Sequence, residues 1–283
     1  MRGVLLPEAG GFLYGRYPAG QREGTISMAG NDSDIRKAIV TIKIIGVGGG
    51  GNSVLMRMAK NKVLDVDLIA VNTDAKQLAL MEQHGIVPLQ IGENLTKGRG
   101  TGGNLELGEN AAKADEEKIR QSLQGADLVF VTAGMGGGAG TGAAPVVARI
   151  AKDLGILTIG VVTVPFSFEG ARKKRLANEG IVKMQANMDA LIAVHNDNLL
   201  KLPENRHMSL VQAFEEADNI LRQAIRCIAE LILTTGVINV DFADVTSIFR
   251  QSESSDALLG IGESERGAVQ AVQCAVQSPL IEK

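Results

Sequence analysis

The chain has 283 residues, of which 45% are hydrophobic and 22% are charged, and its formal net charge is −3 at pH 7. This length accommodates one large or two modest domains, and the slightly acidic balance argues against a nucleic-acid partner held by bulk positive charge. No apolar run reaches the roughly 18 residues of a membrane span, so direct membrane insertion is not expected.

Residues 1–38 are broken by Gly, Pro and charged residues, so they do not resemble a secretory signal and we expect them to be disordered. Met28 is an alternative natural start, which would make residues 1–27 an upstream extension. Cys227 and Cys274 stand in apolar, helical-looking contexts without metal-ligand spacing. Free buried thiols are therefore favoured over a disulfide, and they fit a reducing cytosol.

Short β-branched runs alternate with helical periods between residues 39 and 207, which we take as one domain. The runs predict strands at 40–46, 66–72, 86–91, 126–133, 157–164 and 189–194. The helical periods lie at 50–60, 75–83, 107–123, 143–154 and 171–187. Strands that are apolar throughout are typical of a parallel sheet buried on both faces. We predict an α/β fold, an open and mostly parallel sheet with helices on both faces and ligands at its carboxyl edge.

A long central helix is predicted over residues 208–235, because one apolar stripe recurs along it at helical spacing. The stripe consists of Met208, Val211, Phe214, Leu221, Ile225, Ile228 and Ile232. Gly236 is a plausible C-terminal cap of this helix. The remaining residues, 236–283, are expected to hold a loop over 237–245 and a last helical segment around 265–276.

Three glycine-rich loops follow three different strands. The first, GVGGGGNS at 46–53, contains the G-x-G-x-x-G pattern of dinucleotide sites, but its second strand ends in Asn72 and Thr73 rather than in an acid. A tight packing turn is the alternative, although four consecutive glycines exceed what packing needs. The second loop, KGRGTGGN at 97–104, either wraps a terminal phosphate or is a surface loop.

The third loop, GMGGGAGTG at 134–142, precedes a predicted helix and contains no lysine. Backbone N–H groups at a helix N-terminus form an anion site without a cationic side chain. Two such loops at one sheet edge indicate a diphosphate or triphosphate held from two sides. An ordinary P-loop is excluded, because the sequence contains no G-x-x-x-x-G-K-[ST] motif.

The segment VPFSFEGARKKR at 164–175 offers Glu169 to ribose hydroxyls and Arg172 and Lys173 to phosphate charge, with a solvated charge run as the alternative. On the long helix, Phe214 and Asp218 share a face because they are four residues apart. An aromatic ring and a carboxylate suit guanine, whose N1–H and 2-amino group are adjacent donors, and Asn196 adds a contact to the base. The alternative is that Phe214 belongs to the core.

Asp241 and Asp244 lie three residues apart around Phe242 in an otherwise apolar segment. Two carboxylates so placed can orient a water and a cation for phosphoryl hydrolysis. The alternative is a helix start, with Asn239 or Asp241 as the N-cap. The preceding helix is roughly 40 Å long by its rise per residue. These acids therefore cannot reach a nucleotide in their own subunit, and if they are catalytic they act on a neighbour.

Six motifs together resemble the FtsZ family of tubulin-like GTPases over residues 39–280, in the family's order and spacing. They are GVGGGGN, AVNTDA, VTAGMGGGAGTGAAPVVA, VVTVPFSFEG, AFEEADN and NVDFADV. The resemblance implies binding of GTP and GDP with Mg²⁺ held mainly through the phosphates rather than by protein ligands. It also implies a head-to-tail homopolymer in the cytoplasm at the mid-cell division site, with membrane-tethering and regulatory proteins of the division ring as further partners.

The resemblance and the motifs together give one set of candidate site residues. The catalytic candidates, supplied to the neighbouring subunit, are Asn239, Asp241 and Asp244. The nucleotide-binding candidates are Gly48, Gly49, Gly50, Gly51, Asn52, Ser53, Asn72, Asp74, Gly136, Gly137, Gly138, Ala139, Gly140, Thr141, Gly142, Glu169, Arg172, Lys173, Asn196, Phe214 and Asp218.

The chain departs from the family pattern at four places. Ala139 stands where Thr is usual, Lys173 where Arg is usual and Ser53 where Asn is usual. The chain also ends where the family's second, β-rich domain would begin, so we expect a gene fragment or a truncated form. Two rival functions stay open: a GTP-binding module without efficient turnover, and an NAD-type oxidoreductase that uses the 46–51 pattern.

Overall fold

The computed structural model describes most of the chain. The described residues are 2–5, 12–15, 40–61, 66–201, 208–233, 241–251, 255–258, 260, 262 and 264–276. Two short strands, β1 (Arg2–Leu5) and β2 (Phe12–Gly15), pair antiparallel, so the expectation that all of residues 1–38 are disordered is wrong for these two stretches. Among the described residues, none of the helices has both the length and the hydropathy needed to cross a membrane.

The main sheet has seven strands in the order β5-β4-β3-β6-β7-β8-β9, and every neighbouring pair is parallel. Its strands are β3 (Ile42–Val47), β4 (Asp67–Asn72), β5 (Val87–Gln90), β6 (Leu128–Gly134), β7 (Leu157–Val164), β8 (Ala190–His195) and β9 (Asp256–Ala257). The predicted open parallel sheet is confirmed. The two-residue β9 was not predicted, and it joins the far end of the chain to the edge of the sheet beside β8.

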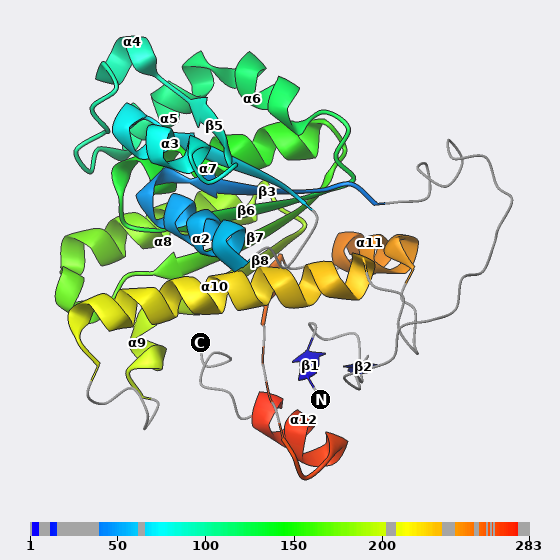
Figure 1. Cartoon of the computed structure of the whole chain (residues 1–283). Helices are drawn as coiled ribbons and strands as arrows, with labels where there is room; N and C mark the ends of the chain where they lie inside the picture. Colours follow the sequence, from blue (N-terminus) through cyan, green and yellow to red (C-terminus); the bar gives the residue numbers. More distant parts are fainter. Residues whose placement is uncertain are drawn as a thin grey trace, which may run out of the picture.

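Helices cover both faces of the sheet (Figure 1). They are α2 (Gly48–Asn61), α3 (Ala75–Glu82), α4 (Glu93–Thr96), α5 (Leu105–Ala114), α6 (Glu116–Leu123), α7 (Gly138–Asp153), α8 (Ala171–Gln185), α9 (Asn196–Leu199), α10 (Leu210–Leu233), α11 (Phe242–Gln251) and α12 (Ala268–Val276), with a short 3₁₀ turn η1 (Ser167–Glu169). The single helix predicted over 107–123 is two helices, α5 and α6, which meet at Asp115. Helix α11 was predicted as a loop at its start.

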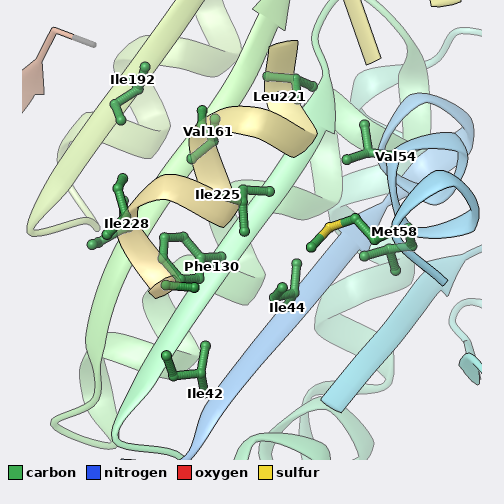
Figure 2. Close-up of a cluster of buried hydrophobic side chains, with 14 of the residues drawn as sticks. Ile42, Ile44, Val54, Met58, Phe130, Val161, Ile192, Leu221, Ile225 and Ile228 are labelled. Carbon is green, nitrogen blue, oxygen red and sulfur yellow. The ribbon is translucent and has the colours of Figure 1, made fainter. Parts of the chain in front are cut away.

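Alternate residues of each central strand enter opposite cores, which explains why the strands read as continuously apolar. Ile44 and Phe130 face α2 and α10, whereas Ile45 and Val131 face the layer of α5 to α8. Figure 2 shows the first of these cores, where Leu221, Ile225 and Ile228 of α10 point at the sheet. Burial of these side chains contributes about 1.5–3 kcal/mol each.

Helix α10 crosses one face of the sheet as a single element of 24 residues, or about 36 Å by its rise per residue. It runs from the α9 end of the molecule to the α11 end (Figure 1). Its predicted stripe is buried only in part: Leu221, Ile225 and Ile228 lie in the core, but Val211 is 68% exposed and Phe214 is 40% exposed. The first turns of α10 therefore present apolar side chains to solvent near the carboxyl edge of the sheet.

Candidate functional site

A cavity of about 280 Å³ lies at the carboxyl edge of the sheet, where β3, β4 and β6 end. It brings together residues from all three glycine loops and from the turn after β4. The lining residues are Gly49, Gly50, Asn72, Thr73, Asp74, Gln77, Gly100, Thr101, Gly134, Gly137, Gly138, Ala139 and Gly140. Eight of these residues are among the predicted nucleotide-binding candidates, whereas Thr73, Gln77, Gly100, Thr101 and Gly134 are not.

Two helices begin at this cavity. Helix α2 starts at Gly48 and α7 starts at Gly138, and no described side chain caps the N-terminus of α7. The first N–H groups of a helix have no partner within the helix, and its dipole favours a negative charge at this end. Gly137, the N-cap of α7, is exposed, and a side chain there would meet nothing within 4 Å. The arrangement can bind an anion through backbone amides.

The first glycine loop serves packing as well. A Cβ atom on Gly48, Gly50 or Gly51 would come under 3.0 Å from the backbone of α7 or β6. Only Gly49 would make an ordinary contact, 3.4 Å from the Gln77 side chain. The inference that four glycines exceed any packing need is therefore wrong, because three of them let α2 approach the neighbouring backbone. That close approach also brings the two helix N-termini together.

The third loop is fixed by similar contacts. A Cβ on Gly138 would meet Thr101 and the backbone of Asn104, and one on Gly142 would meet the backbone of α5. Gly140 packs against the carbonyl oxygens of β3 and β6. Gly136 has a φ of 95°, which favours glycine, and its N–H donates to Oγ1 of the buried Thr141 at 2.8 Å. These contacts fix the conformation of the loop, and Gly137 and Ala139 are the loop residues that line the cavity together with Gly138 and Gly140.

Asn52 and Asn72 form a buried amide network beneath the pocket. With the Asn52 amide oriented to suit its neighbours, Nδ2 donates to the carbonyls of Gly46 and Gly48, and Oδ1 accepts from Asn72. Nδ2 of Asn72 also donates to Gln77 at 2.8 Å, and its Oδ1 accepts from the N–H of Thr73. Both amides are thus engaged within the protein and connect the first loop to the turn after β4.

Three polar residues beside this network differ in how far they are engaged. Asp74 caps α3 by accepting from the N–H groups of Lys76 and Gln77 through Oδ1. The exposed Ser53 hydroxyl bonds back to the carbonyl of Gly49. Oγ1 of Thr73 is buried and has no hydrogen-bond partner among the described residues, although it lies in the lining of the cavity. An orphaned hydroxyl at a cavity wall is a group that a ligand can satisfy.

The second glycine loop folds over the cavity rather than away from it. Gly100 and Thr101 belong to the lining, and Arg99 forms a backbone bridge with Asp74. The alternative of a simple surface loop is therefore wrong for this part of the segment. The sequence left this alternative open, because a loop segment with four glycines gives no indication of the direction in which it folds. The non-glycine Lys97 also adopts a positive φ, of 53°.

An aromatic cluster lies at the carboxyl end of β7, beside the first turns of α10. Phe214 meets Phe166 edge to face with ring centroids 5.4 Å apart, and Phe168 stacks on Phe166 at 4.8 Å. Phe166 is fully buried, whereas Phe168 is 54% exposed and Phe214 is 40% exposed. The alternative that Phe214 is an ordinary core residue is wrong, because its ring keeps an exposed face.

Asp218 lies one turn after Phe214 on α10 and is largely buried. Its Oδ2 accepts from Nε of Arg57 on α2 at 3.2 Å, and Arg57 also pairs with Glu215 at 3.4 Å. Burial raises the pKa of Asp218 above its usual value, and Arg57 opposes part of that rise. Arg57 was missed by sequence reasoning, because its pairing with Asp218 spans 161 positions.

Asn196 begins α9 directly after β8 and is only 4% exposed. Its Oδ1 has no hydrogen-bond partner among the described residues. The neighbouring Asp197 accepts from both the N–H and the hydroxyl of Ser167, which connects α9 to the turn η1. Burial alone would raise the pKa of Asp197, but the two bonds from Ser167 and the charge of Lys174 lower it below its usual value.

The charged segment after β7 is partly committed to its own structure. Glu169 accepts from the N–H of Phe166 at 2.9 Å and from Lys173 at 3.0 Å. Lys173 therefore shares its charge with a carboxylate, whereas Arg172 is exposed and makes no ion pair with a described residue. Glu169 therefore stabilises a turn and Arg172 faces solvent, as the alternative of a solvated charge run expects, while contacts of these residues with ribose and phosphate stay a prediction.

Asp241 and Asp244 lie at the start of α11, a helix at the opposite end of α10 from α9 (Figure 1). Oδ1 of Asp241 accepts from the N–H of Ala243 at 3.2 Å, and Asp244 is in the first turn. The helix-start alternative is therefore confirmed as local structure, while both side chains remain exposed. Asn239 lies outside the described residues. No group of three or more His, Cys, Asp or Glu residues in the described part of the chain is placed to hold a metal ion.

Comparison with known proteins gives matches over most of the chain. A family model described as the GTPase domain of the tubulin/FtsZ family matches residues 41–204. A solved structure of FtsZ from M. jannaschii, described as an empty dimer, is 40% identical with a TM-score of 0.81. That match covers 88% of this chain and 71% of that chain. A mutant of the same protein matches with 39% identity and a TM-score of 0.81, over 88% of this chain and 74% of that chain.

A more distant match has the same fold. CetZ2 from Haloferax volcanii, described as a protofilament with bound GTPgS, is 24% identical with a TM-score of 0.61. The alignment covers 73% of this chain and 62% of that chain. At this identity the likeness is one of fold alone, and it shows that the sheet and its helices recur in a divergent sequence.

Proposed function

The chain belongs to the tubulin/FtsZ family and is a tubulin-like GTPase, and from this premise we propose that it assembles head to tail and completes GTP hydrolysis between two copies. One observation carries the proposal. The cavity lies at the N-terminus of α2, a helix that contacts the first half of α10, whereas the exposed acids Asp241 and Asp244 follow the C-terminus of α10, which is about 36 Å long by helix rise. Only a second copy can bring such acids to the cavity. The oxidoreductase alternative is excluded by the family.

The phosphates of GTP occupy the cavity in this proposal. The N-termini of α2 and α7 supply N–H groups, and the helix dipoles favour the phosphate charge. The Thr73 hydroxyl is positioned to donate where it now has no described partner. This mode of binding explains why the first and third loops contain glycines and no lysine. It does not require Asn52 or Asn72 to touch the nucleotide, because they hold the loops in place.

The guanine base lies beyond the cavity, toward α9 and α10. Asp218 accepts from the adjacent N1–H and 2-amino donors of guanine, a pair of donors that adenine lacks. The Oδ1 of Asn196, which no described residue contacts by a hydrogen bond, is a second acceptor, and the exposed side of Phe214 is an apolar surface for the ring. Glu169 and Arg172 are left to contact the ribose and the phosphates.

Asp241 and Asp244 of one copy enter the cavity of the next and orient the attacking water. Hydrolysis of a phosphoanhydride depends on positioning and charge more than on covalent chemistry, so exposed carboxylates on a rigid helix start suit the task. Mg²⁺ would neutralise phosphate charge, and we propose that the phosphates hold most of it, because Asp74 is the one carboxylate in the cavity lining. In the cell, the filament would belong to the cytoplasmic division ring with its membrane-tethering and regulatory proteins.

The test is the rate of GTP hydrolysis per molecule at increasing protein concentration. Sites shared between copies require the specific rate to rise with concentration, since a lone copy has no acids at its cavity. A specific rate that is constant from nanomolar to micromolar protein would contradict the proposal.

Mixing two inactive variants separates the two halves of the site. Asp218→Ala loses nucleotide but keeps its acids, while Asp241→Ala keeps nucleotide and loses an acid. Their mixture restores activity only if the acids act on a neighbour, and no recovery would refute the interface mechanism.

A second candidate function is favoured by Ala139. Its methyl group lines the cavity where the family usually offers a hydroxyl, so the chain would bind GTP and turn it over slowly. Tight binding together with a low specific rate at every protein concentration would support this alternative.

A further inference from the structure

Two side chains connect the phosphate end of the site to its base end. Arg57 projects from α2, the helix whose N-terminus lines the cavity, and Asp218 projects from α10, the helix that carries the base-reading residues. Nε of Arg57 lies 3.2 Å from Oδ2 of Asp218. The Asp218 side chain is 19% exposed and that of Arg57 is 30% exposed. A partly buried charge pair of this kind is screened less by solvent than a fully exposed pair.

We propose that Arg57 is a positioning residue for base recognition, holding Asp218 ionised and turned so that Oδ1 is left for the guanine donors. The inference rests on the proposed guanine-binding role of Asp218. Its observations are the bond to Oδ2, the burial of the pair and the absence of a hydrogen bond from any described residue to Oδ1. An Arg57 that merely filled space would not select one of the two oxygens.

The protonation state of Asp218 decides whether it can read guanine. An ionised carboxylate accepts from both N1–H and the 2-amino group, whereas a protonated one sets its own O–H against a donor. Burial raises the pKa of Asp218 and therefore works against base recognition. Arg57 lowers that pKa by its hydrogen bond and its charge, and Glu215 raises it. Arg222, one turn further along α10, makes no ion pair with a described carboxylate.

Apolar packing between α2 and α10 fixes the position of the Arg57 backbone relative to α10. Val54 and Met58, on either side of Arg57 in the sequence, are buried against Leu221 and Ile225 of α10 (Figure 2). The two helices are therefore fixed relative to each other by apolar packing. Because of this packing, loss of the guanidinium changes the charge at Asp218 without removing what holds α2 against α10.

The experiment measures binding of GDP, IDP and ADP to the full chain by calorimetry between pH 5 and pH 8. GDP avoids turnover, and IDP differs from it only by the missing 2-amino group. Arg57→Met keeps the aliphatic stem and removes the charge, and we expect it to weaken GDP binding about tenfold to a hundredfold at pH 7. The preference for GDP over IDP should shrink with it. Arg57→Lys keeps the charge but not the fork, and it should recover part of the loss.

The pH profile distinguishes positioning from a structural role. In Arg57→Met the loss of GDP affinity on acidification should begin at a higher pH than in the wild type, since the effect of burial is unopposed. In Glu215→Gln it should begin at a lower pH, since a nearby negative charge is gone. Wild-type GDP affinity in Arg57→Met, or shifts of the same sign in both variants, would overturn the inference.

Two results keep this inference separate from the proposed function. If the wild type does not prefer GDP to ADP, the guanine-reading role of Asp218 itself fails. If that preference holds and is lost in Asp218→Ala but not in Arg57→Met, only the role of Arg57 fails. Should Arg57→Met not fold, Arg57→Lys and Glu215→Gln carry the test, and an unshifted profile in Glu215→Gln refutes it.

Discussion

At the carboxyl edge of the sheet, three loops and two helix N-termini converge on a cavity built almost entirely from backbone and small residues. At the far end of α10, α11 presents two exposed carboxylates at its start. The first region forms its cavity within a single chain. The second presents its carboxylates to solvent, and neither of them belongs to the lining of that cavity.

This difference between the two regions predicts which substitutions change stability and ligand affinity together and which change activity alone. In the pocket region the same glycines pack the fold and shape the cavity, so stability and ligand affinity are coupled there. In the α11 region the acids point away from the core, so their chemistry is separable from folding. The largest effects of substitution are therefore expected in the pocket region and the smallest at α11.

The largest effect is expected for Gly51→Ala. The new methyl would come under 3.0 Å from the Thr132 carbonyl and the Gly46 backbone, neither of which can move as a flexible side chain can. Overpacking of this kind costs about 1–3 kcal/mol of unfolding free energy or more. Because α2 must shift away from β6, GTP affinity should fall together with stability. Urea denaturation and nucleotide titration measure the two losses.

Gly137→Ala is the matched control. Its φ of −88° suits alanine, and a Cβ there meets nothing within 4 Å. The unfolding free energy should therefore stay within about 0.5 kcal/mol of the wild type. GTP affinity should still fall, since the methyl group enters the cavity. Equal losses of stability in Gly51→Ala and Gly137→Ala would contradict the distinction between a glycine required for packing and a glycine that only lines the cavity.

Asp218→Asn should exchange guanine for xanthine. The asparagine amide accepts from N1–H and donates to the 2-carbonyl of xanthine, whereas it opposes the 2-amino group of guanine with its own donor. We expect GTP affinity to fall about tenfold to a hundredfold and XTP affinity to rise above that of the wild type. Competition between the two nucleotides measures the exchange. Loss of both nucleotides would place the base elsewhere.

The same substitution has a pH signature in stability. Burial raises the folded-state pKa of Asp218 above its usual 3.8, so the neutral carboxyl stabilises the fold at low pH and this contribution is lost as pH rises through the folded pKa. Asparagine does not titrate. The unfolding free energy of Asp218→Asn should therefore gain on that of the wild type as pH rises from 3 to 7. If the unfolding free energy of Asp218→Asn instead falls relative to that of the wild type over this pH range, Arg57 outweighs burial.

Much of the fold was predictable from the sequence because the strongest patterns are local. Six of the seven strands follow from apolar runs, and the helices between them follow from their periodicity. The failures are also physical. β9 is two residues long and exists because β8 offers it an edge, and Asp115 ends α5 and starts α6 in a sequence that reads as one helix.

The site was predictable where backbone forms it and less so where side chains meet across the fold. The glycine loops 46–53 and 134–142 are recognisable in the sequence from their composition, and residues of both loops line the cavity. Thr73 and Gln77 carry no such signal, since their place depends on the turn after β4 packing beneath the first loop. The pairing of Arg57 with Asp218 depends on the crossing of α2 and α10, which no local pattern encodes.

Ala139→Thr tests whether backbone amides alone suffice in the pocket. Ala139 lines the cavity, so a hydroxyl there adds one donor near the bound anion. One such hydrogen bond is worth about 0.5–1.5 kcal/mol, which predicts GTP affinity or turnover higher by about twofold to tenfold. Ala139→Val is the matched control, with the same shape and no hydroxyl. Equal GTP affinity and turnover in Ala139→Thr and Ala139→Val would show that the backbone amides suffice to bind the phosphates.

The smallest effect is expected at the α11 end, from Arg250→Met. Nη2 of Arg250 donates to the Gly155 carbonyl at 2.7 Å, next to the C-terminus of α7, where a cation also suits the helix dipole. Val245 and Phe249 keep α11 anchored in the core, so only about 0.5–1.5 kcal/mol of unfolding free energy should be lost.

The division between the regions predicts which function follows that loss. Turnover should fall modestly, since α11 carries Asp241 and Asp244, while GTP affinity stays at the wild-type value. Mixing with a second variant shows whether the cavity or the acids of Arg250→Met are affected. Asp218→Ala should restore the rate of Arg250→Met, because its own Asp241 and Asp244 are correctly placed for the cavity of the neighbouring copy. Asp241→Ala should not restore it. If GTP affinity falls in Arg250→Met, α7 transmits the change from its C-terminus to the cavity at its N-terminus, and the two regions are not independent.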